Sequence, residues 1–101
     1  MLVKFGVYYS RLKRLMRKAL TPIDNCFKHV TGQEATLTST YEGDHSVSSL
    51  HYNDLAADFR TKHLSALIID ELRVRLKKTL GKDFDVVYHN NHLHIEYDPK
   101  Q

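Results

Sequence analysis

Two segments of the chain repeat hydrophobic residues at the three-to-four-residue spacing of a helix. The first begins at Ser10, a residue type that caps helices, and ends at Gly32. Because Thr21-Pro22 resembles a second cap followed by a proline at the first helical position, this segment is either two short helices or one kinked helix. The second segment covers residues 64–80. Its apolar positions are Leu64, Leu67, Ile68, Leu72, Leu76 and Leu80.

The C-terminal residues alternate between hydrophobic and polar positions, which predicts two strands. Phe84–His89 and His92–Tyr97 flank Asn90-Asn91, and asparagine tolerates the positive φ of a two-residue hairpin turn. A shift of one residue would bury the histidines, so the pattern also fixes the register. That register pairs His89 with His92, Val87 with His94 and Asp85 with Glu96. The predicted core face carries Phe84, Val86, Tyr88, Leu93, Ile95 and Tyr97.

The middle of the chain is less regular. Glu34–Ser39 alternates as a short strand, whereas Thr40–Thr61 has no periodicity and is rich in Ser, Gly, His and Asp. A loop of that length in a small domain is usually functional or disordered. With 101 residues, the chain corresponds to one domain, residues 1–101. We therefore expect an α+β fold: a small antiparallel sheet that ends in the C-terminal β-hairpin and packs against helices.

Charge is distributed unevenly along the chain. Six basic residues precede the first acid, Asp24, and they are Lys4, Arg11, Lys13, Arg14, Arg17 and Lys18. This basic segment is either a solvated helix face or a surface that binds an anionic polymer or a membrane. No RNA- or DNA-binding motif accompanies it, so nucleic acid is not an expected partner.

Other features of the sequence exclude whole classes of protein. No apolar run approaches the roughly 20 residues that cross a bilayer. The basic cluster follows a short mixed stretch, the reverse of a secretory signal, so we expect cytoplasmic synthesis without a signal peptide or transmembrane segment. The single cysteine, Cys26, excludes an intrachain disulfide framework and a multi-cysteine zinc finger. A bound metal ion is then the obvious way to stabilise so small a domain, and the seven histidines supply candidate ligands for it.

Candidate metal ligands gather in two places. The irregular segment offers His45, His51 and Asp58, and the hairpin offers His89, His92 and His94. Zinc binds imidazole nitrogen and carboxylate oxygen, and a catalytic site keeps one position open beside three protein ligands. Near Asp58, Arg60 would suit bidentate capture of a substrate carboxylate, although pairing with a local acid is the simpler interpretation.

Two stretches, HSVSSLHYNDLAADFRT (residues 45–61) and FDVVYHNNHLHIEYDPK (residues 84–100), resemble a known superfamily. It is the zinc peptidase superfamily that joins D-alanyl-D-alanine carboxypeptidases, phage peptidoglycan endopeptidases and the hedgehog signalling domain, and small phage-type members are most similar. The family pattern is S-x-H, six residues, D, and a later His-x-His. The resemblance implies a zinc ion held by three ligands, His51, Asp58 and His94. It also implies that His92 orients the site or stabilises the oxyanion, and that His45 lines the substrate cleft.

The chain departs from the family pattern at two positions. Asp54 stands where similar proteins usually have glycine, and His89 stands where similar phage sequences have the glutamate that acts as general base. A neutral imidazole can accept a proton, so His89 is either a substitute base or the mark of a lost activity. Glu96 also occurs in the family pattern, and we expect it, with Asp85, to support a ligand imidazole or a nearby backbone group.

The resemblance implies a zinc metallopeptidase that cleaves peptidoglycan stem peptides next to D-amino acids. Such an endolysin-like hydrolase would belong to phage lysis or to the virion, degrade the bacterial cell wall and act as a monomer. The first alternative is a non-catalytic zinc-binding module of the same fold, which the missing glutamate favours; the zinc would then be structural. The second is a basic nucleic-acid-binding protein whose histidines are incidental.

Overall fold

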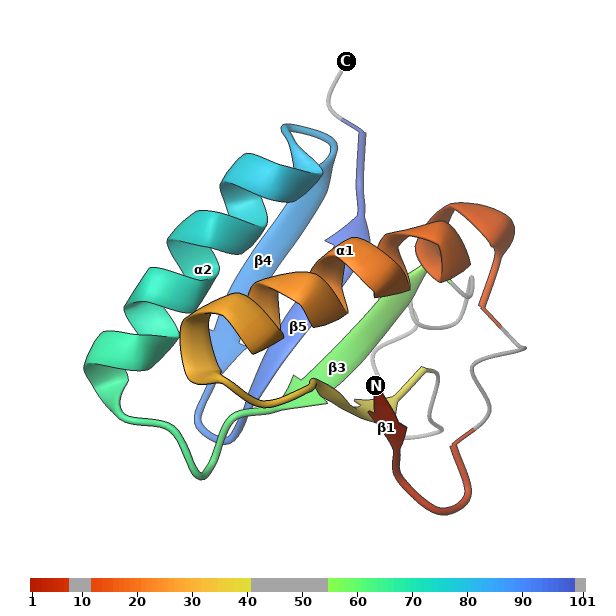
Figure 1. Ribbon diagram of the computed structural model, residues 1–101. Helices are drawn as coiled ribbons and strands as arrows, with labels where there is room; N and C mark the ends of the chain where they lie inside the picture. The colour runs from red at the N-terminus through yellow and green to blue at the C-terminus, as the bar shows by residue number, and fades with distance from the viewer. Residues whose placement is uncertain (8–11, 41–54, 100–101) are drawn as a thin grey trace.

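A computed structural model describes residues 1–7, 12–40 and 55–99 of the protein (Figure 1). Its elements in chain order are β1 (Leu2–Val3), α1 (Arg14–Thr31), β2 (Thr36–Ser39), β3 (Ala56–Arg60), α2 (Ala66–Leu80), β4 (Phe84–His89) and β5 (His92–Tyr97). The strands form one sheet in the order β1-β2-β3-β5-β4, parallel between β1 and β2 and antiparallel elsewhere. Both helices lie on the same side of this sheet (Figure 1). The predicted α+β fold with a C-terminal hairpin is confirmed.

The first helix, α1, is continuous although Pro22 lies inside it. An interior proline removes one backbone hydrogen bond and costs about 3 kcal/mol. The apolar stripe continues across the proline, because Met16, Ile23 and Phe27 are all buried. Each such side chain contributes roughly 1.5–3 kcal/mol, so their burial outweighs the proline. Gly32, at φ 78°, ends the helix as predicted. The predicted cap, Ser10, lies outside the described residues.

The second helix, α2, begins two residues later than the pattern predicts. The Ser65 hydroxyl accepts a hydrogen bond from the Ile68 amide at 3.3 Å and caps the helix. Leu72 and Leu76 are fully buried against the sheet, whereas Leu67 is 82% exposed. The sequence pattern assigns Leu67 to the buried apolar face of this helix, and the structure shows that it lies outside that face. Neither described helix has the length and hydrophobicity that crossing a bilayer requires.

Strand β3 corrects the prediction of an irregular segment from Thr40 to Thr61. Ala56, Ala57, Asp58 and Phe59 are all buried, so this strand is covered on both faces. A strand buried on both sides shows no alternation of hydrophobic and polar residues, which is why its period could not be detected. Pairing with β2 on one side and β5 on the other holds it in the sheet.

The hairpin of β4 and β5 has the predicted register, with His89 opposite His92 and Val87 opposite His94. Most of its predicted core face is buried or packs against the core. Tyr88 is the exception, since 37% of it is exposed. It lies next to the turn on the outermost strand, and its hydroxyl donates to the Asn90 carbonyl oxygen at 2.5 Å instead of entering the core.

A buried carboxylate joins α1 to the residue just before β2. Asp24 Oδ1 accepts a hydrogen bond from the Ala35 amide at 2.9 Å, and Oδ2 lies 3.1 Å from Lys28 Nζ. Burial raises the pKa of Asp24, but the Ala35 amide and the Lys28 ammonium outweigh burial and hold the pKa below its ordinary value. The folded chain therefore keeps this carboxyl ionised.

Candidate functional site

Asp58 and His94 face each other from neighbouring strands. The antiparallel pairing of β3 with β5 places Asp58 directly opposite His94, and Asp58 Oδ1 lies 3.0 Å from His94 Nδ1. Their strand neighbours Phe59 and Leu93 belong to the core under the helices, so Asp58 and His94 occupy the other face of the sheet. Asp58 is only 5% exposed. The sheet thus unites two predicted ligands that are 36 positions apart in the sequence.

The second ring nitrogen of His94 is held by Glu96. His94 Nε2 lies 2.5 Å from Glu96 Oε1, so the imidazole bridges two carboxylates. Burial lowers the pKa of His94, whereas the hydrogen bonds to Asp58 and Glu96, and the charges of both, raise it, and the net effect is a raised pKa. A carboxylate that fixes the far nitrogen of an imidazole is the usual support of a metal-binding histidine. The predicted contact of Glu96 with a candidate ligand imidazole is therefore present, at His94.

The two remaining hairpin histidines lie beside this pair. His92 Nε2 is 3.7 Å from Asp58 Oδ2, and His92 Nδ1 is 2.9 Å from Asn91 Oδ1. His89 is exposed, with its ring centre 5.3 Å from that of His92 and 6.3 Å from that of His94. His89 and His92, the two predicted catalytic residues, therefore lie on the same polar face as the candidate ligands.

Arg60 belongs to that polar face as well. It follows Asp58 by two positions on β3, so the two side chains project to the same side of the sheet. It pairs with His92 on β5 and is partly exposed. A shallow depression that it lines also includes Thr36 and Lys62. Its predicted role in binding a carboxylate stays a prediction.

The remaining predicted residues fall in the stretch that the structure leaves undescribed. His51, the third ligand that the resemblance implies, and His45, the predicted cleft residue, both lie outside the described residues. Asp54, where the family pattern has glycine, lies there too. The structure therefore describes two members of the predicted zinc ligand set.

The described pair fits zinc chemically. Asp58 and His94 supply one carboxylate oxygen and one imidazole nitrogen, both ordinary zinc ligands. Two ligands about 2.0–2.1 Å from a tetrahedral zinc ion are about 3.3 Å apart. The separation of 3.0 Å between Asp58 Oδ1 and His94 Nδ1 is a hydrogen-bond distance, so both side chains would have to turn from each other toward a shared position to bind the ion.

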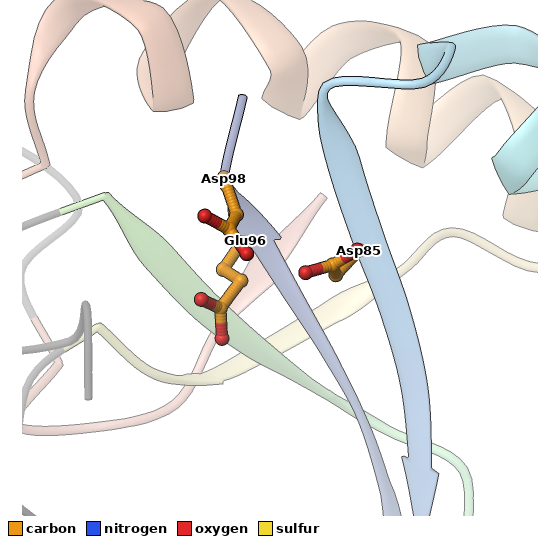
Figure 2. Close-up of side chains that lie close together, drawn as sticks. All are labelled: Asp85, Glu96 and Asp98. Atoms are coloured by element: carbon orange, nitrogen blue, oxygen red, sulfur yellow. The ribbon is translucent and has the colours of Figure 1, made fainter. Parts of the chain in front are cut away.

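Three carboxylates gather farther along the same hairpin. Asp85 on β4, Glu96 on β5 and Asp98 just after it place one oxygen each within 4.8 Å of one another, a spacing that could hold a metal ion (Figure 2). Figure 2 shows the Asp85 carboxylate extending from β4 toward the other two. An all-carboxylate group suits a hard cation such as calcium rather than zinc, and partly exposed acids are common without any ion. Glu96 belongs both to this group and to the support of His94.

Sequence reasoning missed the polar residues of β2 beside the candidate site. Ser39 pairs with Asp58, and the Thr38 hydroxyl donates to the Asp58 carbonyl oxygen at 3.2 Å. Ser39 and Thr40 are buried polar residues. Thr38 and Ser39 could have been found only after β3 was recognised, because it is the pairing of β2 with β3 that brings them to Asp58. The small residues Ala56 and Ala57 were the available signal for a buried strand.

A scan against protein-family models finds no match for this chain, and a search of curated proteins finds none either. The resemblance to zinc peptidases therefore rests on the residues named above.

Proposed function

We propose that this protein is a zinc-dependent peptidase that acts on peptidoglycan stem peptides, with zinc held by His51, Asp58 and His94. The observation that carries the proposal is the contact between Asp58 Oδ1 and His94 Nδ1 at 3.0 Å. These residue types are those that the motif resemblance implies as ligands, and they come from strands that are far apart in the sequence.

The neighbours of the pair support a metal role. Glu96 holds His94 Nε2, which leaves Nδ1 directed at Asp58, and so fixes both the ring orientation and the nitrogen available for a metal. When bound, zinc would supply a Lewis acid for the scissile carbonyl and a lowered pKa for a water molecule. A dedicated carboxylate behind the histidine is consistent with a site that binds an ion rather than with a solvated histidine.

His92 would stabilise developing negative charge, and His89 would accept a proton. His92 lies beside Asp58 and would donate a hydrogen bond to the substrate carbonyl oxygen as negative charge develops on it. His89, whose ring centre is 6.3 Å from that of His94, would accept a proton from the attacking water, since one water molecule can span that distance. Arg60 would bind a carboxylate of the stem peptide.

The setting of this activity is part of the proposal. Substrates with D-amino acids occur in the bacterial cell wall, so the protein would act there as a phage-type lysis or virion-associated enzyme. A second cation at the acidic group of Asp85, Glu96 and Asp98 is not needed for this chemistry, in which Glu96 serves only to support His94.

One observation favours a second candidate function, a zinc-binding module without hydrolytic activity. His89 stands where the resemblance places a glutamate, and it is exposed rather than held in place by the core. Such a module would keep the ligands and their support by Glu96 but would turn over no peptide.

Metal analysis combined with a muropeptide assay tests both candidates. We expect the purified protein to contain one zinc ion per chain. His51→Ala, Asp58→Ala and His94→Ala should each lose the zinc, whereas His29→Ala, an exposed histidine on α1, should keep it. New amines released from muropeptides would support the peptidase, and zinc without new amines would support the module. A wild-type protein without zinc would contradict both.

A further inference from the structure

One line of α2 points away from the core. Its residues follow one another at intervals of four, three and four positions, so they share one side of the helix, and all are exposed. They are Leu67, Glu71, Val74 and Lys78, and we call them the outer stripe. Leu67 is 82% exposed and Val74 is 69% exposed, whereas Leu72 and Leu76 on the opposite side are fully buried. The two apolar side chains of the outer stripe therefore add little to the core of a single chain.

The outer stripe borders a groove between the two helices. All four of its residues line this groove, together with His29 and Val30 of α1. The helices lie side by side on one face of the sheet, and they meet where Cys26 Sγ is 3.5 Å from Thr79 Oγ1 (Figure 1). Val30 is partly buried against the core, so both walls of the groove carry apolar side chains.

Charge is divided between the two halves of the groove wall that α2 forms. Asp70 and Glu71 lie in the N-terminal half of α2, and Arg75 and Lys78 lie in the C-terminal half. Within the part of the chain that the structure describes, neither Glu71 nor Lys78 makes an ion pair, although Arg75 lies at the favourable spacing of four positions from Glu71. A helix face that is acidic in one half and basic in the other is complementary to an antiparallel copy of itself.

We propose that the outer stripe pairs with the outer stripe of a second copy of this chain, with the two α2 helices antiparallel. A twofold axis beside Val74 places this valine against the partner's Val74. The same axis places Glu71 of each chain against the partner's Lys78, so two identical ion pairs flank the central apolar contact. Leu67 then packs along the aliphatic part of the partner's Lys78.

The charge pattern favours a second copy over other occupants of the groove. An acidic helix would meet Glu71 and a basic helix would meet Lys78, so either would bring like charges together. A parallel copy would place glutamate on glutamate and lysine on lysine. Of these arrangements, the antiparallel copy alone joins opposite charges at both positions.

This pairing changes the expected oligomeric state and leaves the candidate site free. The resemblance implies a monomer, whereas the outer stripe implies a dimer that dissociates readily, because one pair of helices makes a small interface. The inference does not depend on the proposed peptidase function. Asp58 and His94 lie on the face of the sheet away from the helices, so pairing through α2 does not cover them.

Sedimentation velocity of the full chain tests this inference. The apparent mass should rise from that of one chain toward that of two as the protein concentration increases to about 1 mM, at which even a weak pairing is populated. Glu71→Lys and Lys78→Glu should each weaken the pairing at least roughly tenfold, because each places like charges against each other at both contacts.

Combining the two charge reversals makes the test specific for the antiparallel arrangement. The double variant Glu71→Lys with Lys78→Glu again joins opposite charges at both contacts, so it should dimerise about as well as wild type. An equimolar mixture of the two single variants should form a mixed dimer, because one chain then carries lysine at both positions and the other carries glutamate at both.

Matched controls lie outside the groove. Lys18→Glu reverses an exposed charge on α1, and Val87→Ser removes an apolar side chain that is 41% exposed on β4. Neither should change the pairing, whereas Val74→Ser should weaken it roughly tenfold, because this residue lies at the centre of the interface.

Three results would overturn the proposal. The first is a wild-type protein that keeps the mass of one chain up to about 1 mM. The second is a dimer that Glu71→Lys leaves intact. The third is a double variant that does not recover the pairing lost in both single variants.

Discussion

His94 and Glu96 lie two positions apart on β5, and His94 Nε2 lies 2.5 Å from Glu96 Oε1. Alternate residues of a strand share a face, so this contact is made within one strand and needs no other element. It leaves His94 Nδ1 for Asp58 across the sheet. A local pair within β5 therefore determines which nitrogen a long-range partner meets.

We predict that Glu96→Gln weakens zinc binding about 10–100-fold, because a carboxylate that supports a ligand histidine contributes that much to metal affinity. Glutamine can still contact His94 but lacks the negative charge. Competition with a fluorescent chelator measures the change, and Glu71→Gln on the exposed side of α2 is the control. Unchanged zinc affinity in Glu96→Gln would contradict a supporting role.

A second prediction concerns His89. If the protein is a peptidase and His89 is the base, His89→Glu should keep or raise turnover of muropeptides, because a carboxylate at this position matches the family pattern. His89→Ala should lower turnover about 10²–10⁴-fold while zinc content stays the same. Complete loss of activity in His89→Glu would mean that residue 89 does not face the reacting water.

The Asp24 link should matter for stability. Asp24→Ala leaves the Ala35 amide without its acceptor in a buried position, and we expect a loss of about 1–3 kcal/mol in the free energy of unfolding. Urea denaturation of the metal-free protein measures it. Asp70→Ala removes an exposed carboxylate from α2 and should change stability by less than about 0.5 kcal/mol. An equal effect of the two substitutions would show that the link contributes nothing.

The pH dependence of this link has a definite sign. The pKa of Asp24 is lower in the folded chain than its ordinary value of 3.8, so the folded state favours the ionised carboxyl. Its contribution to stability is fully present above pH 3.8 and is lost as the pH falls through the lower folded pKa. We therefore expect the stability of wild type relative to Asp24→Asn to decrease below pH 3.8, measured by urea denaturation with chelator present. A difference that stays constant down to pH 2 would contradict the low pKa.

The core under the candidate site gives a further prediction. Phe59 is fully buried, and its ring centre lies 5.9 Å from that of Phe27 on α1. Phe59→Ala should destabilise the protein by about 3–5 kcal/mol, because it leaves a cavity between the helix and the sheet. Val87→Ala, at a position of β4 that is 41% exposed, should cost far less. Thermal denaturation distinguishes the two, and similar losses would be inconsistent with the described core.

The sequence sufficed for the elements whose patterns are local. Both helices and the hairpin register follow from periodicity and from the Asn90-Asn91 turn, because each depends on residues close together in the chain. Strand β3 and the short strand β1 could not be predicted. β3 is buried on both faces and shows no alternation, and β1 has only Leu2 and Val3 and exists through its pairing with β2.

The candidate site could likewise be predicted only in part from the sequence. The polar face of the hairpin could be read from alternation, and the motif resemblance placed Asp58 and His94 in one site. The direct pairing of these residues, and the presence of Ser39 beside them, needed the sheet order, which no local pattern contains. Binding of zinc by the three predicted ligands stays a prediction.

The order of strands has a consequence for biogenesis. β5 lies between β3 and β4, so the hairpin docks on the rest of the sheet through its second strand. A nascent chain that has produced Asp58 must still synthesise α2 and both hairpin strands before His94 can meet it. Such non-local closure is the slow kind of folding step. The pair of Asp58 and His94 therefore forms only after β5 has been synthesised and has docked on β3.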